Sequence, residues 1–322
     1  MADRQNNKTY IQAQFEVPLE ESGSRIDQVL ARLMPDYSRA RLSQWLINGQ
    51  ILVDGLALKP KNRVLGGENI VVNAELEPRV DWSAEKIPLD VVYADSDLII
   101  VNKPAGLVVH PGHGHPSGTL VNALLDLYPE LEKVPRAGIV HRLDKDTSGV
   151  LAVARSLKAQ ANLVKQLKDR SMSRHYCALV YGHPSREGKI DAPMDRHRIQ
   201  RTKMTVVFSG KPAVTQYRLA ETTAHFAWLD VKLETGRTHQ IRVHMTHIGH
   251  PLVGDPVYRQ GRLGLGHTTQ EVRALIDRFP RQALHARKLG LIHPTREKLV
   301  EFEVPIASDL NDLLIALRDA DV

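Results

Sequence analysis

The stretch AGIVHRLDKDTSGVLAVA, residues 137–154, places a densely charged loop between two apolar segments. The second apolar segment, residues 150–154, has the length and composition of a buried strand. Asp144 lies in the loop between Arg142 and Lys145, and cationic neighbours keep a carboxylate ionised. The loop therefore presents a carboxylate suited to nucleophilic or basic chemistry. An ion-paired turn without a catalytic role gives the same pattern.

On both sides of this strand, the segments typical of strands outnumber the helical ones and do not alternate strictly with them. That order argues against a doubly wound parallel sheet. We expect an α+β fold with a mixed, largely antiparallel sheet. The expected strands are 91–93, 98–102, 150–154, 176–181, 204–208, 213–219, 227–234 and 284–291. The expected helices are 119–127, 158–168, 238–248 and 310–318.

A smaller unit precedes this domain. Residues 9–17 alternate like a strand, and Ser24 and Ser38 stand where helix N-caps are expected. ILVDGLAL, residues 51–58, predicts two short strands around an Asp-Gly turn, and another strand follows at 69–73. Basic residues gather on this unit with few acids between them. They are Arg39, Arg41, Lys59, Lys61 and Arg63.

Residues 76–87 carry charges and Pro78 but no apolar periodicity, which favours a linker. We therefore expect an N-terminal domain at 1–75 with its core at 24–73, and a second domain at 88–322.

Composition narrows the class of protein. The 322 residues are 42% hydrophobic and 25% charged, as in ordinary globular proteins. The apolar runs are too short to span a bilayer, and the N-terminus lacks an apolar signal core, so we expect a cytoplasmic protein without membrane contact. Cys177 is the single cysteine, which excludes an intrachain disulfide and a multi-cysteine zinc site. The net charge of +6 permits nucleic-acid binding without requiring it.

A second polar segment is LETGRTHQIRVHMTHIGHPLVGDPVY, residues 233–258. We expect Arg237 to open a helix whose buried stripe is Ile241, Met245 and Ile248. A further basic cluster precedes it, and such clusters are typical of surfaces that follow a phosphate backbone, although solvated loops also carry them. That cluster is Arg196, Arg198, Arg201 and Lys203.

Four segments together resemble one enzyme family. NKPAGLVVHPG at 102–112, AGIVHRLDKDTSG at 137–149, SRHYCALV at 173–180 and TGRTHQIRVHM at 235–245 resemble, in order and spacing, the RluA/RluD family of RNA pseudouridine synthases. The resemblance runs from about residue 88 to 305. SRARLSQWLINGQILVDG, residues 38–55, resembles the alpha-L RNA-binding domain, which is named after a small-subunit ribosomal protein.

The resemblance implies a reaction that detaches uracil from ribose, rotates it and rejoins it through a ring carbon, without cofactor or metal. It implies that Asp144 is the catalytic carboxylate beneath the sugar, that Arg237 is its ion-pair partner, and that Tyr176 stacks on the base and takes a ring proton. The implied substrate-binding residues are His141, Arg142, which fills the place of the flipped uridine, and Ile241, which walls the uracil pocket.

The two-domain order is most similar to the branch of the family that modifies 23S rRNA. The implied substrate is its subunit-bridging stem-loop, met on the pre-ribosomal large subunit by a monomeric enzyme. A different rRNA or tRNA site remains an alternative.

Three other functions fit single features of the sequence. His110, His113 and His115 could hold a hydrolytic metal, but their spacing is not a helical pair and no acid lies nearby. A non-enzymatic ribosome-assembly factor would need only the N-terminal domain and the basic clusters. A glycosidase would need a second carboxylate paired with Asp144, and these motifs offer none.

Overall fold

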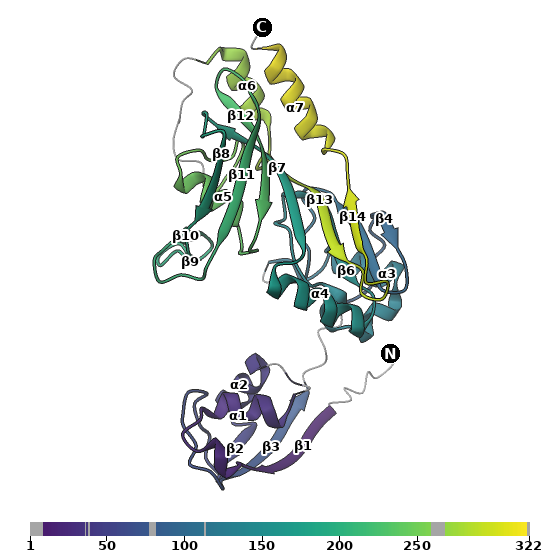
Figure 1. Ribbon diagram of the computed structural model, residues 1–322. Helices are drawn as coiled ribbons and strands as arrows, with labels where there is room; N and C mark the ends of the chain where they lie inside the picture. The colour runs from purple at the N-terminus through teal and green to yellow at the C-terminus, as the bar shows by residue number, and fades with distance from the viewer. Residues whose placement is uncertain are drawn as a thin grey trace, which may run out of the picture. The chain divides into compact units, whose positions relative to one another are not determined.

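The computed structural model describes residues 9–35, 37, 39–76, 82–112, 114–258 and 268–320. The chain divides into two compact units, Met1–Asp81 and Trp82–Val322 (Figure 1). The division falls within the stretch 76–87 that the sequence favours as a linker.

The N-terminal unit is a three-stranded antiparallel sheet in the order β1-β3-β2, accompanied by two helices. Its core contains Ile26, Leu30, Leu42, Leu46 and Ile70, all without solvent exposure. The strands are β1 (Thr9–Glu16), β2 (Ile51–Val53) and β3 (Asn69–Leu76), the helices are α1 (Ile26–Leu33) and α2 (Arg39–Ile47), and a 3-10 turn spans Leu19–Glu21.

Two local expectations for this unit were wrong. Ser24 does not cap α1, because Arg25 is the N-cap residue and is held extended by a β-bridge to Arg63. The expected second strand after the Asp-Gly turn is reduced to a single bridge between Val53 and Leu56, since β2 pairs with β3 instead. The proposed cap Ser38 lies outside the described residues.

The larger unit is built on a nine-stranded sheet in the order β4-β5-β6-β13-β7-β12-β11-β8, with β14 also paired to β13. Only the β13–β6 pair is parallel among its described strands, which confirms an α+β fold with a largely antiparallel sheet. Its strands are β4 (Asp90–Ala94), β5 (Leu98–Lys103), β6 (Ser148–Ala154), β7 (Ser173–Tyr181), β8 (Glu187–Asp191), β11 (Val214–Thr222), β12 (Phe226–Leu233), β13 (Leu284–Ile292) and β14 (Leu299–Glu303). A separate hairpin pairs β9 (Met194–Arg196) with β10 (Met204–Val206).

The four helices expected in this unit are present, and a fifth, α6, was missed. The helices are α3 (Leu120–Leu127), α4 (Leu157–Asp169), α5 (Gln240–His247), α6 (Gln270–Arg278) and α7 (Ser308–Asp319), with 3-10 turns at Pro129–Lys133 and Pro135–Gly138. Helix α6 buries Val272 and Ile276, which stand four residues apart at helical spacing. Helix α5 begins later than expected because His239 adopts a left-handed backbone, with φ of 57°.

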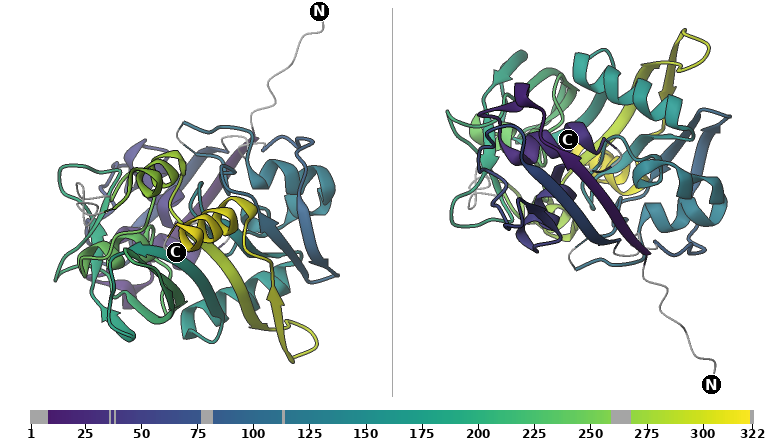
Figure 2. Two further views of the ribbon diagram at one scale, coloured as in Figure 1. Left: turned by 90° about the horizontal axis from the view of Figure 1, so that it is seen from above. Right: turned by 90° about the horizontal axis from the view of Figure 1, so that it is seen from below.

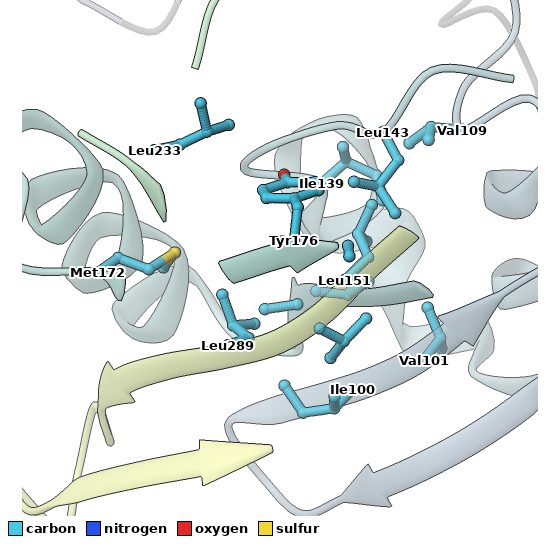
Figure 3. Packing of buried hydrophobic residues seen from close by; sticks show 14 of the residues in the cluster. Ile100, Val101, Val109, Ile139, Leu143, Leu151, Met172, Tyr176, Leu233 and Leu289 are labelled. Carbon is cyan, nitrogen blue, oxygen red and sulfur yellow. The ribbon is translucent and has the colours of Figure 1, made fainter. Parts of the chain in front are cut away.

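Strand β7 separates two apolar cores because neighbouring side chains on a strand point to opposite faces. Cys177 and Leu179 join the core beneath α6 and α7, and Figure 2 shows the yellow helix α7 along that face. Tyr176, Ala178 and Val180 join the main core on the other face, drawn in Figure 3. Tyr176 therefore lies on the face of the sheet that carries the main core. Among the described residues, no helix is long and apolar enough to cross a bilayer.

Candidate active site

Asp144 lies in the loop that leads into the fully buried strand β6. The backbone of the loop turns at this residue, where the Asp144 carbonyl accepts the Thr147 N–H over 3.1 Å. Leu143 beside it is buried in the main core, while the Asp144 side chain is 16% exposed. The loop thus anchors an apolar residue and presents the next one to solvent.

One buried cation and one buried amide side chain hold this loop from two sides. Lys103, which has no solvent exposure, donates to the carbonyls of Pro104, Leu107 and Lys145 over 2.9 Å each. Burial lowers the pKa of this ammonium group to about 7. On the other side Gln282 Nε2 donates to Thr147 Oγ1 over 3.0 Å. The carboxylate is therefore carried on a fixed backbone rather than a free loop.

Asp144 forms its ion pair with Arg242 of α5. Arg242 Nη1 donates to Asp144 Oδ2 over 3.1 Å. The same guanidinium donates through Nε and Nη2 to the two oxygens of Asp255, over 2.7 and 2.9 Å. Asp255 is buried and also accepts the N–H groups of Val257 and Tyr258. Because a two-bond fork fixes the plane of a guanidinium, Asp255 sets the direction in which Arg242 points at Asp144.

Two rings enclose this ion pair. His239 Nδ1 and the Tyr258 hydroxyl lie 2.7 Å apart, and the Arg242 guanidinium lies over the Tyr258 ring, 5.1 Å from its centre. His239 Nε2 is 3.9 Å from Asp144 Oδ2. Burial lowers the pKa of His239, so the ring is uncharged near neutral pH and Arg242 supplies the positive charge beside Asp144.

The expected ion pair between Asp144 and Arg237 was wrong. Arg237 Nε instead donates to the Pro212 carbonyl over 3.2 Å, and its side chain is exposed. Arg237 precedes α5, whereas Arg242 lies inside the helix and is buried. Both belong to the motif TGRTHQIRVHM, and the turn at His239 decides which one faces Asp144.

Tyr176 lies on β7, and its side chain lines the same cavity as Asp144. Figure 3 shows its ring rising from the strand toward Ile139 and Leu143. Burial raises the pKa of the phenol, and the nearby charge of Asp144 acts in the same direction. The ring therefore suits a flat apolar support for a base, while burial disfavours the phenolate that proton removal would need.

One cavity of roughly 730 Å³ lies within the larger unit, and Asp144, Tyr176 and Arg242 are among the residues that line it. It brings together every residue that the sequence analysis placed in the catalytic and substrate-binding sets. They are His141, Arg142, Asp144, Tyr176, Arg237 and Ile241. Arg142 is exposed, whereas Ile241 is buried. His141 Nε2 accepts the Ala152 N–H over 3.1 Å, and burial lowers the pKa of His141 to about 3, so it is a neutral support of the loop.

The predicted RNA-contact residues lie elsewhere, on exposed surfaces of both units. Lys59, Lys61 and Arg63 are exposed in the N-terminal unit. Arg39 is exposed too, but it is ion-paired with the buried Asp27 over 2.8 Å. Arg41 also lies on α2 with its side chain exposed. Around the β9–β10 hairpin of the larger unit, Arg196, Arg198 and Arg201 are exposed and Lys203 is half-buried.

The histidine cluster considered for a metal is not brought together as a described ligand set. His110 lines the cavity and burial lowers its pKa, while His113 lies outside the described residues. The described residues with ligand spacing are Asp95, Asp97 and His293, and none of them lines the cavity. His293 Nε2 already lies within hydrogen-bond distance of Asp95 Oδ2, at 2.8 Å.

The sequence analysis missed several residues of the site, including the partner of Asp144. Arg242 and His239 lie within a motif it quoted, and Asp255 lies within the quoted segment 233–258. The usable signal was the helix itself. Arg242 stands three residues before Met245 of the expected buried stripe, and residues i and i+3 share a helix face, so Arg242 is placed to be buried.

Comparison with known proteins agrees with this geometry. Residues 97–247 match the family model of RNA pseudouridylate synthases, and residues 24–70 match the S4 domain. The solved structure of human RNA pseudouridylate synthase domain containing 4 is 26% identical, with a TM-score of 0.57 over 71% of this chain and 93% of that one. The human domain containing 1 protein is 27% identical, with a TM-score of 0.53 over 73% and 96%.

Two bacterial relatives cover nearly the whole chain. Ribosomal large subunit pseudouridine synthase D of Pseudomonas aeruginosa is 50% identical over 96% of both chains, and that of Salmonella typhimurium is 48% identical over 96% of this chain and 95% of its own. The matched family model spans the loop of Asp144, the strand of Tyr176 and the helix of Arg242. Since likeness of this extent covers both units and the whole cavity, the chain belongs to the family of RNA pseudouridine synthases.

Proposed function

We propose that this enzyme isomerises uridine to pseudouridine in large-subunit ribosomal RNA, the 23S molecule, at the subunit-bridging stem-loop. The support for the substrate is the near-full-length likeness to proteins named ribosomal large subunit pseudouridine synthase D. The S4 domain at 24–70 adds an RNA-binding unit of the expected type.

The observation that carries the proposed chemistry is the ion pair of Asp144 and Arg242 in the wall of the cavity. The reaction breaks the N1–C1′ bond with its electron pair left on the base, and later forms a C5–C1′ bond; the C5 proton then leaves and N1 takes up a proton. Asp144 is the carboxylate that either attacks C1′ or removes a ribose proton. Arg242 orients that carboxylate through a charge-assisted hydrogen bond to Oδ2.

The cavity has the size and lining for a flipped nucleoside. Binding sites for small ligands occupy about 300–1,000 Å³, and this one falls in that range. Tyr176 and Ile241 supply apolar walls for a uracil ring. Extruding a uridine from a stem costs a few kcal/mol. Arg142 is exposed at the cavity and is the side chain that we propose takes the place of the extruded base.

RNA outside the target uridine meets the basic surfaces. We assign backbone contacts to the N-terminal residues Arg39, Arg41, Lys59, Lys61 and Arg63 and to the hairpin residues Arg196, Arg198, Arg201 and Lys203. Phe208 is exposed near the same hairpin, and an aromatic ring among arginines suits stacking on unpaired bases. Arg237, exposed at the cavity, also fits a backbone contact. The enzyme is proposed to act as a monomer in the cytoplasm.

Pseudouridine mapping of total RNA from cells lacking this protein tests the proposal. The expected result is loss of pseudouridine at a few 23S positions, restored by the wild-type gene. Restoration by an Asp144→Asn gene would support the non-enzymatic assembly role instead. Loss of pseudouridine only in tRNA or in another ribosomal RNA would agree with the proposed reaction and overturn the proposed substrate.

A further inference from the structure

Arg174 is a buried cation of the cavity for which the functions above give no role. It lies on β7 two residues before Tyr176, so both side chains point to the same face of the sheet. Its residue exposure is 7%, and it lines the cavity. Its Nε is buried without a hydrogen-bond partner, and no described residue forms an ion pair with its guanidinium.

This arrangement contrasts with the other buried arginines of the unit. Arg242 is forked to Asp255, and Arg281 is paired with Asp309 over 2.6 Å. An unpaired buried charge is costly, so proteins seldom keep one without a use. Burial lowers the pKa of Arg174, and the titratable group that acts on it from within the cavity is the phenol of Tyr176.

The backbone leaves space for this guanidinium at one glycine. A Cβ placed on Gly236 would lie 2.4 Å from Arg174 Nη1. Gly236 does not have a left-handed φ, so its backbone does not demand glycine. The glycine instead accommodates the Arg174 head group at the cavity wall, directly before Arg237.

We propose that Arg174 binds a carbonyl oxygen of the target uracil and stabilises the negative charge that the base acquires when it leaves the ribose. The inference rests on the proposed function and adds the group that recognises the base. A guanidinium offers only N–H donors, and uracil offers the acceptors O2 and O4. The buried, unpartnered cation therefore has its counter-charge supplied by the substrate.

The bond changes require such a group whichever role Asp144 has. When N1–C1′ breaks, its electron pair stays on uracil and is shared by N1, O2 and O4. When C5–C1′ forms, an electron pair of the ring enters that bond; the C5 proton then leaves with its bonding pair kept by the ring, and N1 takes up a proton. Preorganised donors aimed at developing charge in a water-poor site are among the strongest contributions to catalysis. Arg174 is such a donor during the interval in which the base is detached.

A backbone phosphate is a poorer fit for this cation. Phosphates of the bound strand lie at the mouth of a base-flipping pocket, where exposed Arg142 and Arg237 are available. Arg174 lies at the depth of Tyr176, the proposed support for the ring, and both are nine-tenths buried. That depth favours the base over the strand.

The first test is Arg174→Met, which keeps the length of the side chain and removes its charge. We expect kcat on a 23S stem-loop to fall about 100-fold or more, the range for loss of one oxyanion donor, with RNA affinity within about threefold of wild type. The melting temperature should stay equal or rise, since no ion pair is lost. Arg281→Met is the matched control, and it should lower the melting temperature because it breaks the ion pair with Asp309. A lower melting temperature for Arg174→Met with unchanged kcat would make Arg174 structural and overturn the proposal.

The second test replaces the oxygen instead of the arginine. Stem-loops with 2-thiouridine or 4-thiouridine at the target carry a weaker acceptor at one position. We expect one of them to slow wild type about tenfold and to slow Arg174→Met by less than about twofold, because the contact is already gone. Equal slowing of both enzymes by both substrates overturns the proposal.

Gly236→Ala gives an independent variant whose side chain would displace the guanidinium without removing it. It should reproduce the fall in kcat and the lost thio effect. Wild-type activity in this variant, with the full thio effect, would also contradict the proposal. If wild type converts no uridine in ribosomal RNA, the proposed function itself fails, which is a different result from an active wild type with an indifferent Arg174.

Discussion

The cavity and the N-terminal basic surface use positive charge in opposite ways. In the cavity, Arg242 is buried and makes three hydrogen bonds to two carboxylates. On the N-terminal unit, Lys59 and Lys61 are exposed, and neither has an ion pair with a described residue. A fixed, buried charge acts on a particular atom, whereas an exposed charge acts on the average potential of an RNA strand. Substitutions should therefore affect kcat in the first region and affinity in the second.

The largest effect is expected at the carboxylate itself. Asp144→Asn keeps the shape and removes the charge and basicity, so turnover should fall by roughly 10³-fold or more. RNA affinity should stay within about threefold, because Asp144 is not part of the basic surface. Nucleoside chromatography after incubation with a 23S stem-loop measures the first quantity, and filter binding measures the second.

Asp146→Asn is the matched control in the same loop. Its side chain forms no hydrogen bond with any described residue, although its backbone carbonyl accepts from Arg281. Turnover close to wild type is expected. Substantial turnover by Asp144→Asn, or equal loss in both variants, would show that the loop matters as a whole and that Asp144 has no special role.

The next effect probes the residue that orients Arg242. Asp255→Asn removes a buried charge that accepts four hydrogen bonds, two from Arg242 and two from backbone N–H groups. Breaking a buried ion pair from one side should lower the free energy of unfolding by about 3–5 kcal/mol. In the protein that remains folded, kcat should fall about 10- to 100-fold with little change in KM.

Denaturant unfolding and single-turnover kinetics at a low temperature separate these two consequences. If the folded fraction keeps the wild-type kcat, Asp255 contributes stability alone and Arg242 needs no orienting partner. Asp255→Glu, which restores the charge, should recover part of the rate.

The same contrast explains what could be predicted from the sequence. The loop, the strand of Tyr176 and the helix after Arg237 were placed correctly because local apolar patterns and quoted motifs define them. The partner of Asp144 was misplaced because one left-handed residue, His239, turns Arg242 rather than Arg237 toward the carboxylate. Helix α6 was missed although its buried residues Val272 and Ile276 stand at helical spacing. Long-range contacts such as Arg242 with Asp255 follow from packing and leave no local pattern.

A smaller effect is expected at Tyr176, where ring and hydroxyl can be separated. Tyr176→Phe keeps the flat ring, and the raised pKa of the phenol disfavours its use as a base, so turnover should fall less than about tenfold. Tyr176→Leu loses the ring and should fall about 100-fold. Release of tritium from 5-tritiated uridine RNA measures the proton-loss step. A loss with Tyr176→Phe as deep as with Tyr176→Leu would assign the proton transfer to the phenol.

The smallest effect on chemistry, and the clearest on affinity, belongs to the N-terminal surface. Replacing both Lys59 and Lys61 by Gln should leave kcat at saturating RNA unchanged, because neither residue lines the cavity. Each phosphate contact contributes about 0.9 to the slope of log affinity against log salt concentration, so the double variant should flatten that slope by nearly two. Lys298→Gln, an exposed lysine of the larger unit, serves as the control. An unchanged slope would remove both lysines from the RNA contact, whereas a fall in kcat at saturation would show that this surface also acts on the chemistry.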